Sequence, residues 1–315
     1  MNAAPVRLIL DTDMDTDCDD AGALAVLHAL ADAGECALLG VVCSVPVPAC
    51  VAAVRAIDAW HGRADIPVGL VEVPGYDADP AWRPYREHRG RCDADGVLYN
   101  GRLGETGSTA ESAVGIYRRL LAGQPDGSVT ICAVGTLTAL AQLLASPADG
   151  HSPLNGAELV RTKVRELVCM AIAGYPAGED RFNWAMDRAS AAEVVRAWPG
   201  WLTVSELGQA IPTGAGFAAA APPDNPVRLA YEIFLGGSGR TRPSWDLVAA
   251  LYAVRGLAGP FALSGPRRLE FSAATGRHAW VADAAGARRL LRHLIDDTAM
   301  ASLLEDLLLA TLRGR

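Results

Sequence analysis

Up to about residue 206, short runs of apolar residues alternate with longer segments in which apolar residues recur every three or four positions. The short runs are typical of buried strands, and the longer segments of helices that pack one face against a sheet. Strands are predicted at residues 6–10, 36–44, 65–70, 128–134, 166–174 and 201–205, and helices at residues 21–34, 48–62, 108–123, 136–146 and 190–200. Because strands that alternate with helices usually pair in parallel, the pattern predicts an α/β fold with a mainly parallel, twisted sheet and helices on both faces.

Beyond about residue 206 the pattern becomes mostly helical. Helices are predicted at residues 225–237, 244–256 and 287–312, and a hairpin at residues 267–283 turns at Thr275-Gly276. Residues 74–107 form the longest irregular stretch, and such loops in compact domains are typically lids or disordered segments. Without repeats or a low-complexity linker, residues 1–315 are expected to form one domain.

Composition narrows the classes of function. The chain has 315 residues, 50% of them hydrophobic, with a net charge of −8, and no basic stretch is dense enough for a nucleic-acid partner. No apolar run approaches about 18 residues and the first residues do not resemble a signal peptide, so no membrane partner is expected. The 7 cysteines are an odd number without CxxC spacing, which favours a reduced, cytoplasmic protein.

The segment LILDTDMDTDCDD, residues 8–20, crowds aspartates after the first predicted strand. Asp11 and Asp13 fall at the end of that strand, and Asp19 and Asp20 at the start of the next helix, at the sheet edge where ligands bind in open parallel sheets. Capping this helix needs only one or two carboxylates, and the remaining ones repel each other unless a cation or shared protons relieve them. The segment therefore predicts a cation site.

Two known acidic motifs fit this segment poorly. An EF-hand loop needs glycine and glutamate where this chain has Thr16 and Gly22, so it is rejected. A haloacid-dehalogenase-type phosphotransferase resembles the segment more closely, but its threonine would stand one position earlier, and Lys163 is the only lysine available for it. This phosphotransferase remains an alternative.

The same segment resembles the DTDPGxDD motif of the inosine-uridine preferring nucleoside hydrolase family. Here it reads DTDMDTDCDD, two residues longer, as in one branch of that family. Further segments resemble the family in the same order, namely LLGVVCSVPVP, GRADIPVGL, ICAVGTLTALAQLL, CMAIAGYPAGEDRFNWAMDRASAAEVV and SWDLVAALYAVRG. The resemblance runs from about residue 7 to residue 256 and implies a nucleoside hydrolase-like α/β domain.

The resemblance also implies roles for individual residues. Asp13 corresponds to the general base and a metal ligand, and the other ligands are Asp20, Asp246 and the backbone carbonyl of Val134. Ribose would be bound by Asp19 and Asn183, with Asp11 supporting the site from behind.

The implied reaction is hydrolysis of the N-glycosidic bond of a ribonucleoside or related N-riboside, by water that is bound to Ca²⁺ and activated by Asp13. Calcium fits because it accepts 6–8 oxygen ligands. The family resemblance also implies a homodimer or homotetramer.

Several positions depart from the family pattern. Trp245 replaces the histidine that protonates the leaving group in many members, and it is expected to stack on the base; His88 and Arg240 are alternative candidates for the acid. Ser44 stands where a ribose-binding asparagine is common. Arg181 replaces a glutamate near the 5′ side of the sugar, which predicts a preference for an acidic substituent. These departures keep open a second hypothesis, a non-catalytic relative that binds nucleosides or ribose.

Overall fold

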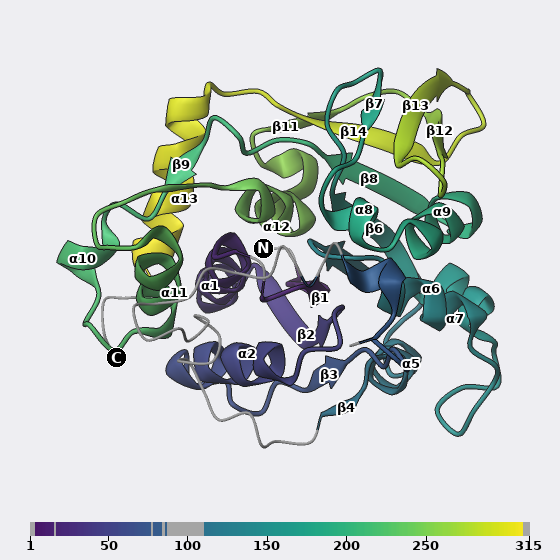
Figure 1. Cartoon of the computed structure of the whole chain (residues 1–315), viewed down its shortest axis with the longest axis horizontal. Coiled ribbons are helices and arrows are strands. Elements are labelled where there is room, and N and C mark those ends of the chain that lie inside the picture. The colour runs from purple at the N-terminus through teal and green to yellow at the C-terminus, as the bar shows by residue number, and fades with distance from the viewer. Residues whose placement is uncertain (1–3, 16, 77, 84–85, 87–109, 311–315) are drawn as a thin grey trace.

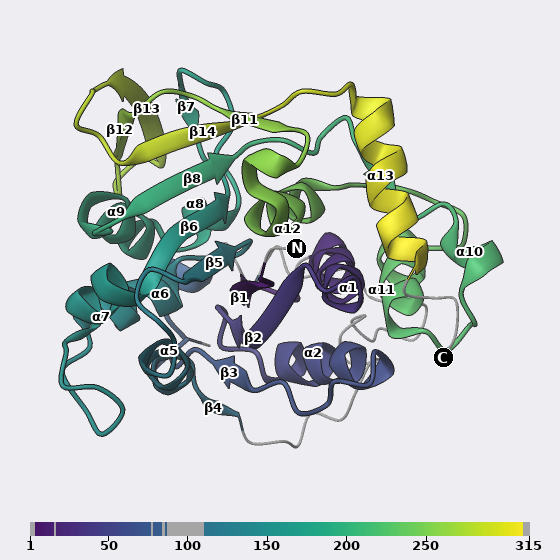
Figure 2. The same cartoon turned by 180° about the vertical axis from the view of Figure 1, so that it is seen from behind.

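The computed structural model describes residues 4–15, 17–76, 78–83, 86 and 110–310. Their main sheet is continuous and twisted, and helices cover both of its faces (Figures 1 and 2). Neighbouring strands of this sheet pair in parallel in the order β4 (Glu111–Ser112), β3 (Val68–Leu70), β2 (Cys36–Cys43), β1 (Val6–Thr12), β5 (Val129–Ala133), β6 (Val164–Met170), β8 (Trp201–Ser205) and β14 (Arg288–His293). The α/β class and the mainly parallel sheet predicted from the sequence are confirmed.

The order of the strands creates a switch point at β1. From β1 the chain builds β2, β3 and β4 on one side and then crosses to β5 on the other side. Ligands in open α/β sheets bind at such switch points, beyond the carboxyl ends of the strands. Two hydrogen bonds hold this edge together: Val134 N donates to Asp11 O (2.8 Å) and Ser44 N donates to Thr12 O (2.8 Å). The first acidic residues therefore lie beside the ends of β2 and β5.

Helices pack on the two faces of the sheet over separate hydrophobic cores. One face carries α1 (Asp19–Asp32), α2 (Pro48–Trp60) and α12 (Trp245–Arg255), with α10 (Phe217–Ala220), α11 (Pro226–Leu235) and α13 (Asp297–Ala310) outside them. The other face carries α5 (Ala113–Ala122), α6 (Thr138–Ala145), α7 (Gly156–Lys163), α8 (Asn183–Met186) and α9 (Arg188–Ala197).

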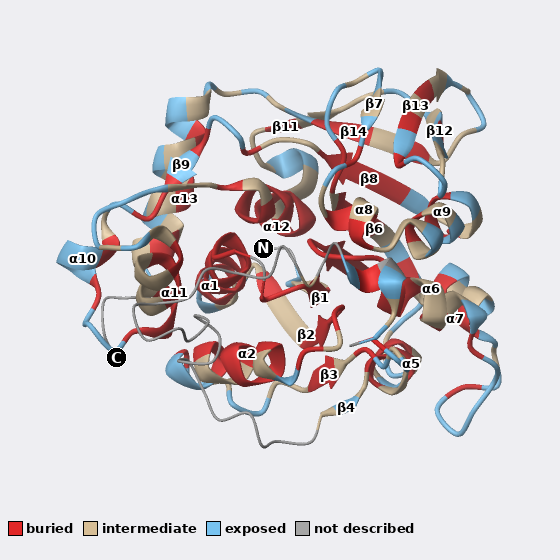
Figure 3. Cartoon of the chain, in the orientation of Figure 1, coloured by how far each residue is buried: buried red, intermediate tan, exposed pale blue. Residues whose placement is uncertain are grey.

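Helices α1 and α12 are buried along most of their lengths, as Figure 3 shows. Gly22 makes their close packing possible, because a Cβ atom there would lie 2.4 Å from the hydroxyl of Tyr231 and 2.9 Å from Leu247. The N-termini of both helices thereby reach the same end of the sheet, and the carboxylates of their first turns come together.

The C-terminal part contains more strand than the sequence pattern indicated. The helix predicted at 287–312 is wrong in its first part, where β14 pairs in parallel with β8; among the described residues of this range, α13 alone is helical. Arg288 explains the difference, because its buried guanidinium donates to the carbonyls of Val195, Trp198 and Gly200, contacts that fix this segment beside β8.

The predicted hairpin is confirmed. It consists of β12 (Arg267–Phe271) and β13 (Arg277–Ala282), and it extends the sheet antiparallel to β14 and to β7 (Ala177–Glu179). β11 (Phe261–Leu263) also pairs with β14, and β9 (Pro212–Thr213) and β10 (Arg242–Pro243) form a small separate ribbon. Two short 3₁₀ helices complete the described elements, η1 (Pro80–Trp82) and η2 (Gly256–Ala258).

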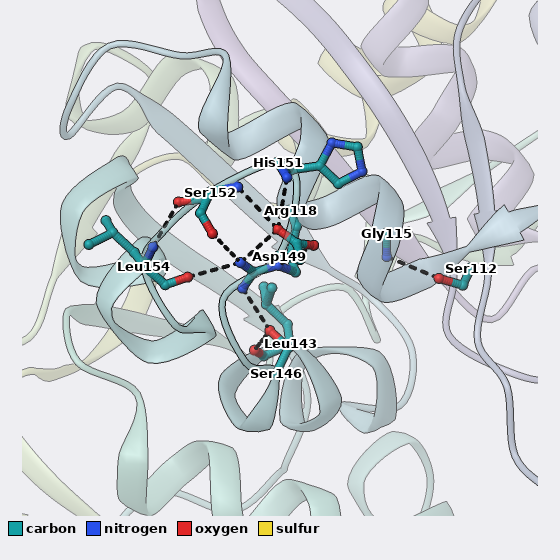
Figure 4. A network of polar contacts seen from close by, with 9 residues as sticks. All are labelled: Ser112, Gly115, Arg118, Leu143, Ser146, Asp149, His151, Ser152 and Leu154. Atoms are coloured by element: carbon teal, nitrogen blue, oxygen red, sulfur yellow. Dashed lines mark hydrogen bonds and ion pairs between the residues drawn. The ribbon is translucent and has the colours of Figure 1, made fainter.

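A buried arginine secures the loop between α6 and α7 (Figure 4). Arg118 of α5 pairs with Asp149 (Nε to Oδ2, 2.7 Å) and donates to Ser146 Oγ (3.0 Å). It also donates to the carbonyls of Ser152 (3.1 Å) and Leu154 (2.9 Å). One guanidinium thus gives a hydrogen-bond partner to the buried Ser146 hydroxyl and to the buried Ser152 carbonyl of this loop.

The cysteines in the described ranges (18, 36, 43, 50, 132 and 169) are buried and form no disulfide. Cys132 and Cys169 lie in central strands, as predicted. Within the described part of the chain, no helix is both long and apolar enough to cross a membrane.

Candidate active site

A cavity of about 320 Å³ opens at the carboxyl ends of the central strands, between the N-termini of α1 and α12. Five aspartates on its wall, called the acidic cluster below, are Asp13, Asp17, Asp19, Asp20 and Asp246. All five are buried. The rest of the wall includes Val134, Met170, Ile172, Glu179, Asp180, Arg181, Phe182, Asn183, Glu206, Arg242 and Trp245. The structure therefore brings together the predicted residues of β1, α1, α12 and the loop at 181–183.

Close packing against a glycine and a side-chain hydrogen bond place the first aspartates of the acidic cluster. Asp13 follows β1 and packs against Gly135, where a Cβ atom would lie 2.7 Å from Asp13 N and 2.8 Å from Asp13 Cβ. Only glycine at position 135 allows this close approach. The turn at residues 135–138, which follows β5, therefore packs directly against Asp13. The hydroxyl of Thr12, the last residue of β1, donates a hydrogen bond to the Asp20 carboxylate and fixes its position.

The distant Asp246 joins the acidic cluster through the first turn of α12. Its backbone N–H donates to Asp19 Oδ2 (3.2 Å), so Asp19 caps this helix. Capping by a carboxylate is favoured at a helix N-terminus by the orphan N–H groups and the helix dipole. One hydrogen bond thus links the two chain segments that the sequence predicted to meet.

Burial dominates the electrostatics of the acidic cluster. Burial, followed by the charges of neighbouring aspartates, raises the pKa of Asp13, Asp19 and Asp246 well above the usual range, and that of Asp20 to about 8. Asp17 differs, because its hydrogen bonds with Asp19 and Arg242 and the charge of Arg242 outweigh its burial and lower its pKa. A cation would relieve the carboxylates that Arg242 does not compensate.

The donor set suits a hard divalent cation. Carboxylate oxygens of Asp17, Asp19 and Asp246 lie within 4.8 Å of one another, and Asp13 and Asp20 share the cavity wall. Ca²⁺ and Mg²⁺ take oxygen ligands of this kind, and Ca²⁺ tolerates irregular sets with a backbone carbonyl. The sequence pattern assigned no role to Asp17, which the fold places in this close group.

The Val134 carbonyl and Asn183 contact each other directly. Asn183 Nδ2 donates to Val134 O (2.6 Å) and to Met170 O (3.2 Å), which fixes the amide at the cavity wall. A carbonyl oxygen accepts two hydrogen bonds or ligands. Val134 O therefore retains one lone pair that can accept a further ligand.

Asp180 organises the loop that carries Arg181 and Asn183. Its Oδ2 accepts from Ile172 N (2.8 Å), and its Oδ1 accepts from Phe182 N (3.1 Å) and Ala185 N (2.9 Å). This buried carboxylate thereby ties the end of β6 to the start of α8. Its neighbour Arg181 lines the cavity with an exposed side chain.

Arg242 is a charged residue of the cavity wall that the sequence pattern does not predict. Its Nη2 donates to Asp17 Oδ2 (2.7 Å), and its Nε lies 3.7 Å from Asp19 Oδ1. The guanidinium carbon lies 4.8 Å from the centre of the Trp245 ring and 5.0 Å from that of Phe234. Arg242 thus packs against one face of the Trp245 ring. Local sequence carries no signal for a pair between residues 17 and 242.

Some predicted residues lie away from the cavity wall. Ser44 is fully buried behind it, near Gly135. Asp11 also lies behind it, where burial raises its pKa to about 7 and Tyr117 donates to it (2.5 Å). Arg240 is exposed and donates to Leu235 O (2.8 Å).

The lysine that a phosphotransferase would need lies outside the acidic cluster. Lys163 donates to Asp126 (2.7 Å) and to Gln124 O (2.9 Å). His88, a candidate for the leaving-group acid, lies outside the described residues, as does most of the predicted lid at 74–107.

Comparison with known proteins identifies a matching family model and solved structures of similar fold. A family model described as inosine-uridine preferring nucleoside hydrolase matches residues 8–255. No curated protein matches the sequence. The effector protein XOO4466 is a similar solved structure, with a TM-score of 0.72 and 16% identity over 99% of this chain and 95% of that chain.

Two further structures share the fold. The type III effector XopQ, in complex with adenosine diphosphate ribose, has a TM-score of 0.70 and 15% identity over 99% of this chain and 94% of its own. The nucleoside hydrolase of Bacillus anthracis has a TM-score of 0.66 and 16% identity over 98% of this chain and 99% of its own.

Proposed function

The chain belongs to the inosine-uridine preferring nucleoside hydrolase family, and from this premise we propose that it hydrolyses the N-glycosidic bond of a ribonucleoside or a related N-riboside. The observation that carries the proposal is the cavity at the β1–β5 switch point, whose wall gathers five buried aspartates with Asn183 and Val134. The two extra residues between Asp13 and Asp19 support a place in the branch with the longer acidic motif.

We assign Ca²⁺ as the cofactor, held by Asp13, Asp20, Asp246 and the Val134 carbonyl. When bound, the cation would supply positive charge that orients vicinal hydroxyls and favours deprotonation of water. The all-oxygen donor set supports this assignment, as does the burial that raises the pKa of Asp13, Asp20 and Asp246.

The chain's own residues divide the remaining work. Asp13 takes the proton from the attacking water, which is the task of a general base in contact with the substrate. Asp19 and Asn183 bind the ribose hydroxyls. The remaining negative charge of the acidic cluster stabilises the oxocarbenium character that develops at the anomeric carbon.

Departure of the base requires a proton donor, and in this chain the donor must be a group other than a histidine before Asp246, because Trp245 occupies that position. Trp245 cannot donate a proton to a leaving nitrogen, and Arg242 already covers one of its faces. We assign this step to Glu206, a carboxyl group on the cavity wall directly after β8. Trp245 then contributes an apolar contact to the base.

Arg181 supports a substrate with an acidic substituent on the sugar's 5′ side. Arg181 lines the cavity, and guanidinium groups bind phosphates through paired hydrogen bonds. XopQ, which shares the fold, was crystallised with adenosine diphosphate ribose. We therefore propose 5′-phosphorylated ribosides as preferred substrates; comparable turnover of a nucleoside and its 5′-monophosphate would contradict this preference.

The test of the proposed function is a panel of purine and pyrimidine nucleosides, their 5′-monophosphates and adenosine diphosphate ribose, assayed with calcium. Release of base and of reducing sugar, lost in Asp13→Asn, supports the hydrolase. Release of inorganic phosphate instead favours the phosphotransferase.

A non-catalytic binding protein is the second candidate function. The observation that favours it is the pairing of Trp245 with Arg242, in place of a histidine before Asp246. Calorimetric binding of a riboside without turnover of any member of the panel would support it.

We propose a cytoplasmic location, because the described cysteines are buried thiols, and a homodimer or homotetramer, as the family resemblance implies. Light scattering coupled to size-exclusion chromatography tests the oligomeric state.

A further inference from the structure

Arg242 is a cation built into the wall of a cavity that otherwise gathers carboxylates. Its backbone is fixed by pairing of β10 with Thr213 of β9, and its side chain packs against the rings of Phe234 (5.0 Å) and Trp245 (4.8 Å). Three supports of this kind hold the guanidinium in one place, so it is part of the site and not a solvent-exposed charge.

Arg242 compensates one particular aspartate. Asp17 Oδ2 accepts from Arg242 Nη2 (2.7 Å), and Asp17 Oδ1 accepts from Asp19 N (3.2 Å), so both oxygens are engaged. Asp17 lies in the loop that is two residues longer than the DTDPGxDD motif. The longer loop therefore brings an additional negative charge, and the distant Arg242 matches it.

We propose that Arg242 is a positioning residue that holds Asp17 as its own counter-ion, keeps Asp17 out of the ligand set of the divalent cation, and thereby limits how tightly the rest of the acidic cluster binds that cation. This inference rests on the proposed function, because it presupposes a cation site. The close approach of Asp17, Asp19 and Asp246 shows why the pair matters: without Arg242, Asp17 lies near enough to act as a ligand.

The charge of Arg242 also acts on the cation directly. Its Nε lies 3.7 Å from Asp19 Oδ1 and has no hydrogen-bond partner among the described residues. A positive charge this close repels a divalent cation in the cavity, and the repulsion is weakly screened because the groups are largely buried. In a variant without Arg242, the loss of its positive charge and the release of Asp17 would both increase the affinity of the acidic cluster for the cation.

The experiment measures the calcium Kd of the full chain by isothermal titration calorimetry, for the wild type and three variants. Arg242→Gln is expected to bind calcium at least about tenfold more tightly than the wild type. Arg242→Lys keeps the charge and is expected to stay within about threefold of the wild type. The double variant Arg242→Gln/Asp17→Asn removes both charges together and is also expected to stay within about threefold.

The double variant guards against misfolding, because it does not leave the buried Asp17 carboxylate without its counter-ion, and thermal unfolding in EDTA checks each variant. Unchanged or weaker binding by Arg242→Gln overturns the inference. A loss of tenfold or more in the double variant also overturns it, because Asp17 would then be a ligand. A wild type that binds no calcium contradicts both this inference and the proposed function. A wild type that binds calcium with a Kd that Arg242→Gln leaves unchanged contradicts the inference alone.

Discussion

Raising the pH from about 5 to about 8 is expected to destabilise the calcium-free protein and to increase the stabilisation that calcium confers. Asp20 carries the reasoning: it is fully buried, and burial, followed by the charge of Asp17, raises its pKa from 3.8 to about 8. Because the folded pKa lies above the unfolded one, this group's contribution to stability is fully present below about pH 4 and is lost as the pH rises to about 8.

The size of the effect follows from that difference. Each pH unit between the two pKa values changes the free energy of unfolding by about 1.4 kcal/mol, so Asp20 alone accounts for roughly 6 kcal/mol at most. The other carboxylates of the acidic cluster share the same protons, so their contributions do not add in full. Calcium favours the ionised carboxylates and competes with protons, and its stabilisation therefore grows with pH.

Thermal unfolding in EDTA and in millimolar calcium, at several pH values across this range, measures both trends. Calorimetry in two buffers of different ionisation enthalpy counts the protons released on binding, and we expect at least about one near pH 6.5. Asp20→Asn is the control, since it removes the titrating group and is expected to flatten the pH dependence. A calcium-induced shift in Tm that is constant, or largest at the acidic end, would refute the reasoning.

The remaining predictions concern the reaction and the fold. Asp13→Asn is expected to lower kcat by at least about a hundredfold, because a general base is lost; release of the base, followed by chromatography, measures this, and a loss below about tenfold would contradict the assignment. Glu206→Gln is expected to slow hydrolysis of nucleosides far more than that of a 4-nitrophenyl riboside, whose leaving group needs no proton; equal slowing of both excludes Glu206 as the acid. Arg118→Met is expected to lower the free energy of unfolding in urea by about 1–3 kcal/mol, because it leaves the buried Ser152 carbonyl and the part-buried Leu154 carbonyl without their donor. The neighbouring Arg119→Met removes an ion pair of partly exposed side chains and should cost less than about 1 kcal/mol, so similar losses for the two would contradict the role of burial.

The parallel part of the sheet was predictable because its strands are short apolar runs between amphipathic helices. The same logic predicted that Asp13 and Asp20 lie together at the ligand-binding edge, since Asp13 ends the first strand and Asp20 begins the helix that follows it. Asp246 was found only through the family resemblance, because nothing in its local sequence distinguishes it from an ordinary acid in the first turn of a helix.

Other features depend on contacts between segments that are distant in sequence. The apolar spacing of residues 288–293 fits a helix as well as a strand, and pairing with β8 decides for the strand. Arg242 meets Asp17 only in the folded protein, and the three hydrogen bonds accepted by Asp180 depend on the turn of its loop. Sequence periodicity therefore predicts the sheet and the helices that cover it, but it does not predict ion pairs between residues that are distant in sequence.

The position of β14 has a consequence for synthesis of the protein. β14 pairs with β8, so the second edge of β8 stays open on the ribosome until residues 288–293 have left the exit tunnel. A nascent chain that has emerged through residue 255, where the family match ends, still presents an unpaired strand edge. Such edges template pairing with other chains, so the interval of translation between β8 and β14 is the period in which this protein most needs a chaperone.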